Sequence, residues 1–319
     1  MNKLFLGASF IYLLFVLVFI SLLSFQGTSI VYADFVPTPH FTNDTPADFK
    51  NLFFSVAHDG ENIVLPETNK GVVFHGPRNK KEIALTFDAD MTEWMKEQLL
   101  SGNVQSYYNQ QLIDYLDQTH TKATLFLTGM WIELYPDAAK KLASDPLFEL
   151  GSHSYSHPSF SGYCYDLPSM TPDGPQGQIE KTQQLLYSLT KTKNTLFRFP
   201  GGCYSQEDLA LLQKDGIRAI QWDVVGDDGF NNNTQAIEDN VLHNVRSGSI
   251  IVMHMNGYPN DPKTSDALPD IVTTLKQRGY TFVTISELLA PKMSFAQQNE
   301  LQVFKNYLLS DNRSVKNGV

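Results

Sequence analysis

The segment Lys81-Glu-Ile-Ala-Leu-Thr-Phe-Asp-Ala-Asp90 decides how the chain is expected to fold. Its run from Ile83 to Phe87 is short, apolar and rich in β-branched and aromatic residues, which favours a buried strand. The run ends directly in Asp88, and Asp90 follows two residues later. We therefore expect a buried strand that carries two acidic side chains at its carboxyl end.

The same pattern recurs along the chain. Similar runs occupy residues 123–128, 148–151, 196–199, 219–225, 250–254 and 281–285. Apolar residues at helical spacing separate several of them, namely Leu112, Ile113 and Leu116, then Ile237, Val241 and Val245, then Leu268, Ile271, Val272 and Leu275. This alternation predicts about seven parallel strands with crossover helices, in an open doubly wound sheet or in a closed or nearly closed barrel.

The segments on either side of this region differ from it. Residues 1–33 contain an uncharged apolar run at 4–25, followed by Val31 and Ala33, which suit cleavage before Asp34 by signal peptidase. The run is also long enough to span a bilayer, so an uncleaved membrane anchor is the alternative. In both cases we expect a secreted or cell-surface protein that meets the membrane through this segment alone.

Three further boundaries follow from composition. Residues 34–80 are rich in Pro, Asn, Asp and Thr and show no sustained period, which predicts an irregular extension. Residues 81–290 form the predicted domain. Residues 291–319 are expected to form a helix that ends near Leu309 and a polar tail.

Composition also limits the function. Of 319 residues, 42% are hydrophobic and 18% charged, which is too apolar for a disordered chain. The net charge of −10 disfavours binding to nucleic acid and to anionic membrane surfaces. The two cysteines cannot form a four-thiolate zinc site, so any metal ion must be held by histidine and carboxylate side chains.

Polar residues gather at the predicted carboxyl ends of the strands: Asp88, Asp90, His153, His157, Arg198, Asp227, Asp228 and His254. Each has an ordinary structural explanation when taken alone, such as a solvated turn or a core histidine. His153 and His157 suit two ligands of one zinc ion if their segment forms a helical turn. Because loops at this rim build the active sites of β/α folds, the recurrence predicts one shared site.

Together and in this order, the segments resemble the polysaccharide deacetylase family, which is carbohydrate esterase family 4 with a NodB homology domain. The resemblance covers residues 81–289. Its motifs are Thr86-Phe87-Asp88-Ala89-Asp90, His153-Ser154-Tyr155-Ser156-His157, Arg198-Phe199-Pro200-Gly201, Trp222-Asp223-Val224-Val225-Gly226-Asp227-Asp228 and Val252-Met253-His254.

The resemblance implies a deformed, incomplete (β/α) barrel and a metal-dependent hydrolase acting on C–N amide bonds other than peptide bonds. The implied substrate is an acetylated glycan, namely a polymer of N-acetylglucosamine such as peptidoglycan or chitin, or in some members the O-acetyl groups of xylan. It also implies that Asp90, His153 and His157 bind Zn²⁺, or another divalent ion such as Co²⁺, Ni²⁺ or Mn²⁺.

The implied catalytic groups surround this metal site. Asp88 would act as the general base and His254 as the general acid, because an amide nitrogen leaves poorly without a proton. Arg198 would orient Asp88 and hold it ionised, and Asp228 would hold His254 charged. The residues expected to meet the substrate or the oxyanion are Gly201, Phe230 and Val252.

The chain departs from the family pattern at three positions. Ala89 separates two aspartates that are usually adjacent, but alternate side chains of an extended segment share one side, so both can face the metal. Gly201 stands where the family often has Tyr, and Gly229 stands where it has Trp, with Phe230 as the candidate substitute.

Several alternatives stay open. The rival functions are a carbohydrate-binding pseudoenzyme that keeps the barrel, and a hydrolase of the same fold that acts on a small C–N amide. Cys164 and Cys203 are expected at the same rim, either as a disulfide or as two unpaired buried thiols.

Overall fold

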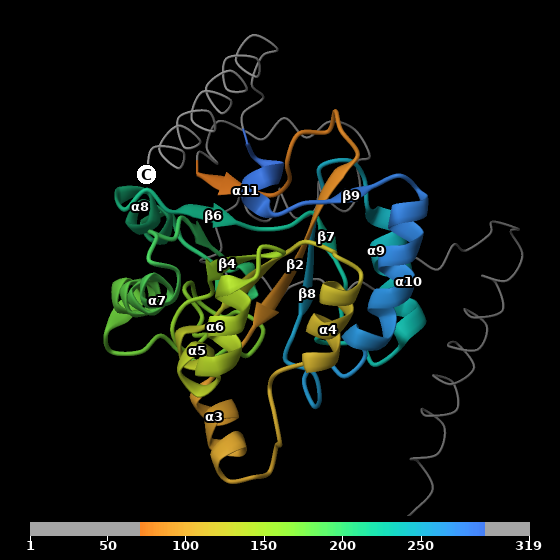
Figure 1. The fold of residues 1–319 in the computed structure, drawn as a ribbon. Coiled ribbons are helices and arrows are strands. Elements are labelled where there is room, and N and C mark those ends of the chain that lie inside the picture. The colour runs from red at the N-terminus through yellow and green to blue at the C-terminus, as the bar shows by residue number, and fades with distance from the viewer. Residues whose placement is uncertain (1–70, 291–319) are drawn as a thin grey trace, which may run out of the picture. The chain divides into compact units, whose positions relative to one another are not determined.

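The computed structural model describes residues 71–290, which form a curled parallel sheet flanked by helices (Figure 1). Three predicted segments lie outside the described residues: the leader or anchor at 1–33, the part of the irregular extension that precedes residue 71, and the carboxyl-terminal segment 291–319. Within residues 71–290, no helix is both long and apolar enough to cross a bilayer.

The sheet of the described region has nine strands, and all of their pairings are parallel. They are β1 (Val72–Val73), β2 (Glu82–Ala89), β3 (Ala123–Leu127), β4 (Phe148–Ser152), β5 (Leu196–Phe197), β6 (Arg218–Ile220), β7 (Val224–Val225), β8 (Ile250–His254) and β9 (Thr281–Phe282). Their order is β1-β6-β5-β4-β3-β2-β8-β7, and β9 pairs with the start of β2. The predicted incomplete β/α barrel is confirmed.

The single strand predicted over residues 219–225 is wrong, because this segment forms two strands. β7 is the last strand of the order and β6 is the second, next to the end strand β1, although only residues 221–223 join β6 and β7. The two ends of the sheet must therefore approach each other, which curls the sheet. Asp223 stabilises this junction, because its Oδ1 accepts the Ile250 N–H at 2.8 Å and its Oδ2 accepts from Arg78 at 2.6 Å.

A second difference lies in the extension predicted to be irregular. Val72 and Val73 form β1, which pairs with Ala219 and Ile220 of β6. A strand of two residues is too short to show alternation, so the sequence carries no signal for it.

The helices of the described region are α3 (Glu93–Leu100), α4 (Gln110–Gln118), α5 (Gly129–Leu134), α6 (Pro136–Ser144), α7 (Gly174–Thr190), α8 (Gln206–Lys214), α9 (Thr234–Asn244), α10 (Thr264–Gln277) and α11 (Ile285–Leu288), with a 3₁₀ turn, η2, at Pro200–Gly202. The three predicted apolar stripes are the buried faces of α4, α9 and α10, except that Val245 follows the end of α9. In Figure 1, α9 and α10 run side by side next to β7 and β8.

The alternation of side chains along β2 positions the site. Ile83, Leu85 and Phe87 belong to the large core cluster that includes buried residues of α4 and α10, and Ala89 belongs to the same cluster. The intervening side chains face the other side of the strand, where Asp88 contacts Arg198. The prediction that Ala89 turns away from the two aspartates is confirmed.

Candidate active site

The predicted polar residues meet at one end of the barrel, at the carboxyl ends of β2, β4, β5, β7 and β8. Three groups of contacts join them: Asp90 with His153 and His157, Asp88 with Arg198, and Asp228 with His254. The expectation that strand-end residues converge on one rim is therefore confirmed.

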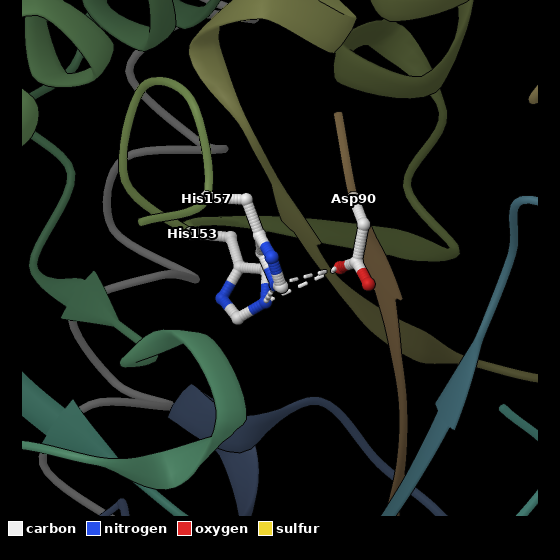
Figure 2. Close-up of side chains that lie close together, drawn as sticks. All are labelled: Asp90, His153 and His157. Carbon is white, nitrogen blue, oxygen red and sulfur yellow. Dashed lines mark hydrogen bonds and ion pairs between the residues drawn. The ribbon is translucent and has the colours of Figure 1, made fainter. Parts of the chain in front are cut away.

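Asp90, His153 and His157 form a compact cluster (Figure 2). Oδ1 of Asp90 lies 3.4 Å from Nε2 of His153 and 3.3 Å from Nε2 of His157. The two Nε2 atoms are 3.1 Å apart, and the three candidate ligand atoms lie within 4.8 Å of one another. One carboxylate and two imidazoles are a ligand set that divalent transition metals use.

The surroundings of this cluster fit a cation. Nδ1 of His153 donates to the Arg198 carbonyl at 2.9 Å, which leaves Nε2 as the free ligand atom. Oδ1 of Asp90 is buried and accepts no hydrogen bond from the described residues. Burial alone would raise the pKa of Asp90, but His157 and His153 hold it well below its usual value, so the carboxylate is anionic.

The loop that carries the two histidines is not the helical turn considered from their spacing. β4 ends at Ser152, and the backbone then takes left-handed conformations at Ser154 (φ 66°) and His157 (φ 58°). Oε1 of Gln178, on α7, accepts the N–H groups of Tyr155 and Ser156, each at 2.9 Å. A distant glutamine therefore shapes the loop, which local spacing cannot indicate.

Asp88 has a different environment from Asp90. Nη1 of Arg198 donates to Oδ1 of Asp88 at 2.7 Å and to Oγ1 of Thr86 at 2.8 Å. The guanidinium is fully buried and lies 4.1 Å from the centre of the Phe126 ring. Oδ2 of Asp88 lies 3.7 Å from Nε2 of His153, so this carboxylate borders the cluster while Arg198 holds its other oxygen.

Asp228 holds His254 by two bonds. Oδ1 of Asp228 accepts from Nδ1 of His254 at 2.9 Å, and Oδ2 accepts the His254 backbone N–H at 2.8 Å. Burial lowers the pKa of His254, but the Asp228 carboxylate outweighs it, and the pKa lies well above its usual value. The imidazole is therefore charged at neutral pH and can donate a proton.

Several positioning residues escaped the sequence analysis. Asn256 clamps the backbone of Asp90, since its Oδ1 accepts the Asp90 N–H at 3.0 Å and its Nδ2 donates to the Asp90 carbonyl at 2.7 Å. Thr264 donates to Oδ2 of Asp228 at 2.6 Å. Asn256 lies two residues after His254, so alternation could have found it, whereas Thr264 lies on α10 and has no local signal.

The predicted substrate-contacting residues are spread over the rim and the strands. Gly201 lies in η2 with φ 59°, and the next two N–H groups, those of Gly202 and Cys203, donate to the carbonyls of Phe199 and Pro200. Phe230 is exposed at the rim, and Val252 is buried inside β8, two residues before His254. The contacts of these residues with a substrate stay predictions.

Two further features border the site. Cys164 and Cys203 form a disulfide, with 6.3 Å between their Cα atoms, which settles the alternative left open by the sequence. A Cβ on Gly229 would lie only 3.2 Å from Cε1 of His254, so a larger residue at this position would crowd the imidazole.

Comparison with known proteins identifies the family to which this chain belongs. The polysaccharide deacetylase family profile matches residues 75–220. A peptidoglycan-N-acetylglucosamine deacetylase of Bacillus cereus is 30% identical over 215 residues, which cover 67% of this chain and 70% of that protein. The peptidoglycan-N-acetylmuramic acid deacetylase PdaA of Bacillus subtilis is 28% identical over 221 residues, which cover 68% and 74%.

Solved structures agree with this result. The peptidoglycan N-acetylglucosamine deacetylase Bc1960 superposes with a TM-score of 0.59 at 29% identity, covering 70% of this chain and 94% of that one. BA3943, a carbohydrate esterase family 4 pseudoenzyme of Bacillus anthracis, gives a TM-score of 0.56 at 26% identity, covering 70% of each chain. The chain therefore belongs to the polysaccharide deacetylase family.

Proposed function

We propose that this protein is a metal-dependent hydrolase that removes acetyl groups from a polysaccharide containing N-acetylglucosamine. The observation that carries the proposal is the separation of two carboxylates with different partners. Asp90 faces two histidines, whereas Asp88 is bonded to a buried arginine. One acid is thus available to bind an ion while the other keeps its lone pairs for proton transfer.

Asp90, His153 and His157 would hold the ion. Their nitrogen and oxygen donors suit Zn²⁺, and Co²⁺, Ni²⁺ or Mn²⁺ are alternatives. When bound, such an ion polarises the acetyl carbonyl and makes hydroxide available near neutral pH.

The remaining residues supply the proton transfers. Asp88 takes a proton from the attacking water, and Arg198 orients this carboxylate. His254, held charged by Asp228, donates a proton to the leaving amine nitrogen. The Gly201 N–H is the proposed donor to the developing oxyanion. The products are acetate and a free amine, and exchange of protons with solvent returns Asp88 to its ionised form and His254 to its charged form.

The substrate class follows from the relatives. Those described above are named for peptidoglycan and act on its N-acetylglucosamine or N-acetylmuramic acid residues. We assign N-acetylglucosamine polymers to this chain, with peptidoglycan first and chitin-like glycans second. Such substrates lie outside the cell membrane, in agreement with export or surface anchoring through residues 1–33.

A carbohydrate-binding pseudoenzyme is the second candidate, because BA3943 shares this fold. The complete set of metal-site and acid–base side chains in this chain favours turnover instead. The test is acetate release from N-acetylglucosamine oligomers and peptidoglycan by the purified full chain, together with metal analysis. The proposal is supported if the wild type releases acetate and His153→Ala loses both the bound zinc and the acetate release. Glycan binding without acetate release by the zinc-loaded wild type would favour the pseudoenzyme.

A further inference from the structure

Most of the exposed aromatic side chains of the described region, all except Tyr187 on α7, follow the carboxyl ends of strands at the rim of the barrel. Trp94 follows β2, Tyr163 and Tyr165 follow β4, Phe230 follows β7, and Tyr258 follows β8. Large exposed apolar groups concentrated in one place mark binding surfaces. Aromatic residues at this rim are therefore candidates for contact with the glycan.

Tyr165 and Phe230 are distinguished because they contact each other. Their ring centres are 5.9 Å apart, with a tilt of 40° between the planes. Tyr165 is 41% exposed and Phe230 is 74% exposed, whereas the other ring pairs of the described region lie mainly in the core. The two rings come from different loops, one after β4 and one after β7.

The pair lies close to two of the proposed catalytic groups, Gly201 and His254. A Cβ on Gly201 would be 3.1 Å from the Tyr165 ring, so this ring borders the proposed oxyanion donor. Phe230 directly follows Gly229, whose Cβ position is 3.2 Å from the His254 ring. The Tyr165 ring therefore lies against Gly201, and Phe230 is adjacent in sequence to the residue that approaches His254.

The position of Tyr165 combines an unfavourable backbone conformation with a neighbouring disulfide. Tyr165 has a left-handed backbone (φ 49°), as does Asp166 (φ 57°), and this conformation is unfavourable for most residues. The neighbouring Cys164 is bonded to Cys203, which directly follows η2. Its sulfur lies 2.6 Å from the position of a Gly201 Cβ, so the disulfide fills the space where a side chain at residue 201 would begin.

We propose that Tyr165 and Phe230 form a two-ring platform that binds a pyranose ring of the glycan next to the acetamido group that is hydrolysed, with the disulfide holding Tyr165 in place. The inference rests on the proposed function and adds the residues that determine substrate affinity. The apolar C–H face of a glucosamine ring can lie on exposed aromatic faces, while its hydroxyl groups stay in water. Tyr165 thus places an aromatic ring beside Gly201, a residue that has no side chain of its own to contact the sugar.

The test separates binding from chemistry. The zinc-loaded full chain is assayed with the N-acetylglucosamine tetramer and with 4-nitrophenyl acetate, whose acetyl group reaches the site without a sugar. We compare Tyr165→Ala, Tyr165→Leu and Phe230→Ala with Tyr187→Ala, a matched control because Tyr187 is 56% exposed on α7. Tyr165→Leu keeps apolar volume but removes the ring face, so it controls for packing damage.

We expect the three platform variants to raise KM for the tetramer about 3- to 10-fold with little change in kcat, on the scale of an aromatic contact. Their loss of kcat/KM should be smaller for 4-nitrophenyl acetate, which has no sugar ring, than for the tetramer, and Tyr187→Ala should match the wild type in both assays. Unchanged KM for the tetramer in Tyr165→Ala and Tyr165→Leu would overturn the platform.

A binding measurement keeps this result independent of turnover. The tetramer is titrated calorimetrically into Asp88→Asn, with and without Tyr165→Ala. Weaker binding in the double variant supports the platform even if the wild type releases no acetate, an outcome that would remove the deacetylase proposal alone. Equal binding by the two variants, with an active wild type, would remove the platform alone.

Discussion

Arg198 and Asp88 form an ion pair inside the barrel, with Nη1 of Arg198 2.7 Å from Oδ1 of Asp88 and both side chains buried. The two residues are 110 positions apart in the chain. The same arginine accepts a hydrogen bond from His153 through its carbonyl. One residue therefore orients both the proposed base and a proposed metal ligand.

Removing the arginine should destabilise the fold. Arg198→Met would leave Asp88 buried without its partner, and breaking a buried pair in this way costs about 3–5 kcal/mol of unfolding free energy. Adding Asp88→Asn removes the uncompensated charge and should restore part of the loss. Urea unfolding of the wild type, both single variants and the double variant measures this coupling. Wild-type stability in Arg198→Met would show that the pair is not a structural element.

The two aspartates of the first motif should give different defects. Asp88→Asn should keep zinc near wild-type occupancy while kcat falls by about 10² or more, the scale of general-base loss. Asp90→Asn should weaken zinc binding first, with some activity recovered at excess metal. Metal content and acetate release are measured on each variant. Loss of zinc in Asp88→Asn with retention in Asp90→Asn would reverse the two assignments.

The pH dependence of activity should report the pairing of His254 with Asp228. Burial lowers the pKa of His254 and Asp228 raises it, with a net result well above the usual value. Since a general acid must be protonated, activity is present below this raised pKa and is lost as pH rises through it. Asp228→Asn should move the alkaline limb of kcat/KM to lower pH.

Asp227→Asn is the matched control for this shift. It makes the same change of charge one residue away, and asparagine tolerates the left-handed backbone of Asp227 (φ 63°). Its alkaline limb should stay at the wild-type position. An unchanged limb in Asp228→Asn would show that His254 does not set it.

The Cys164–Cys203 bridge should stabilise the rim. It joins residues 39 positions apart, and a loop of this size is worth about 3–4 kcal/mol in the chain-entropy model. Serine at both positions should lower the unfolding free energy by about this amount, and KM for the glycan tetramer should rise as Tyr165 loses its tether. Two alkylatable thiols in the unreduced, unfolded protein would rule out the bridge.

Much of the fold could be predicted because its signals are local. The run from Ile83 to Phe87 is a strand in the structure, and the apolar stripes of α4 and α10 are buried as predicted. The clustering of polar residues at strand ends also followed from the sequence, since parallel strands place their carboxyl ends at one rim. The division of residues 219–225 into β6 and β7 did not follow, because closure of the sheet determines it.

The sequence by itself determined which residue types reach the rim: two acids spaced to share one side of β2, a histidine pair after β4, and an acid and a histidine at β7 and β8. Periodicity alone left open which carboxylate meets the histidines and which meets Arg198; the family resemblance implied the assignment, the tertiary structure agrees with it, and only the tertiary structure decided which loop supplies the ring beside Gly201. The physical reason is that periodicity orients a side chain relative to its own strand. Its partner depends on the register and curl of the whole sheet, which brings together residues more than 100 positions apart.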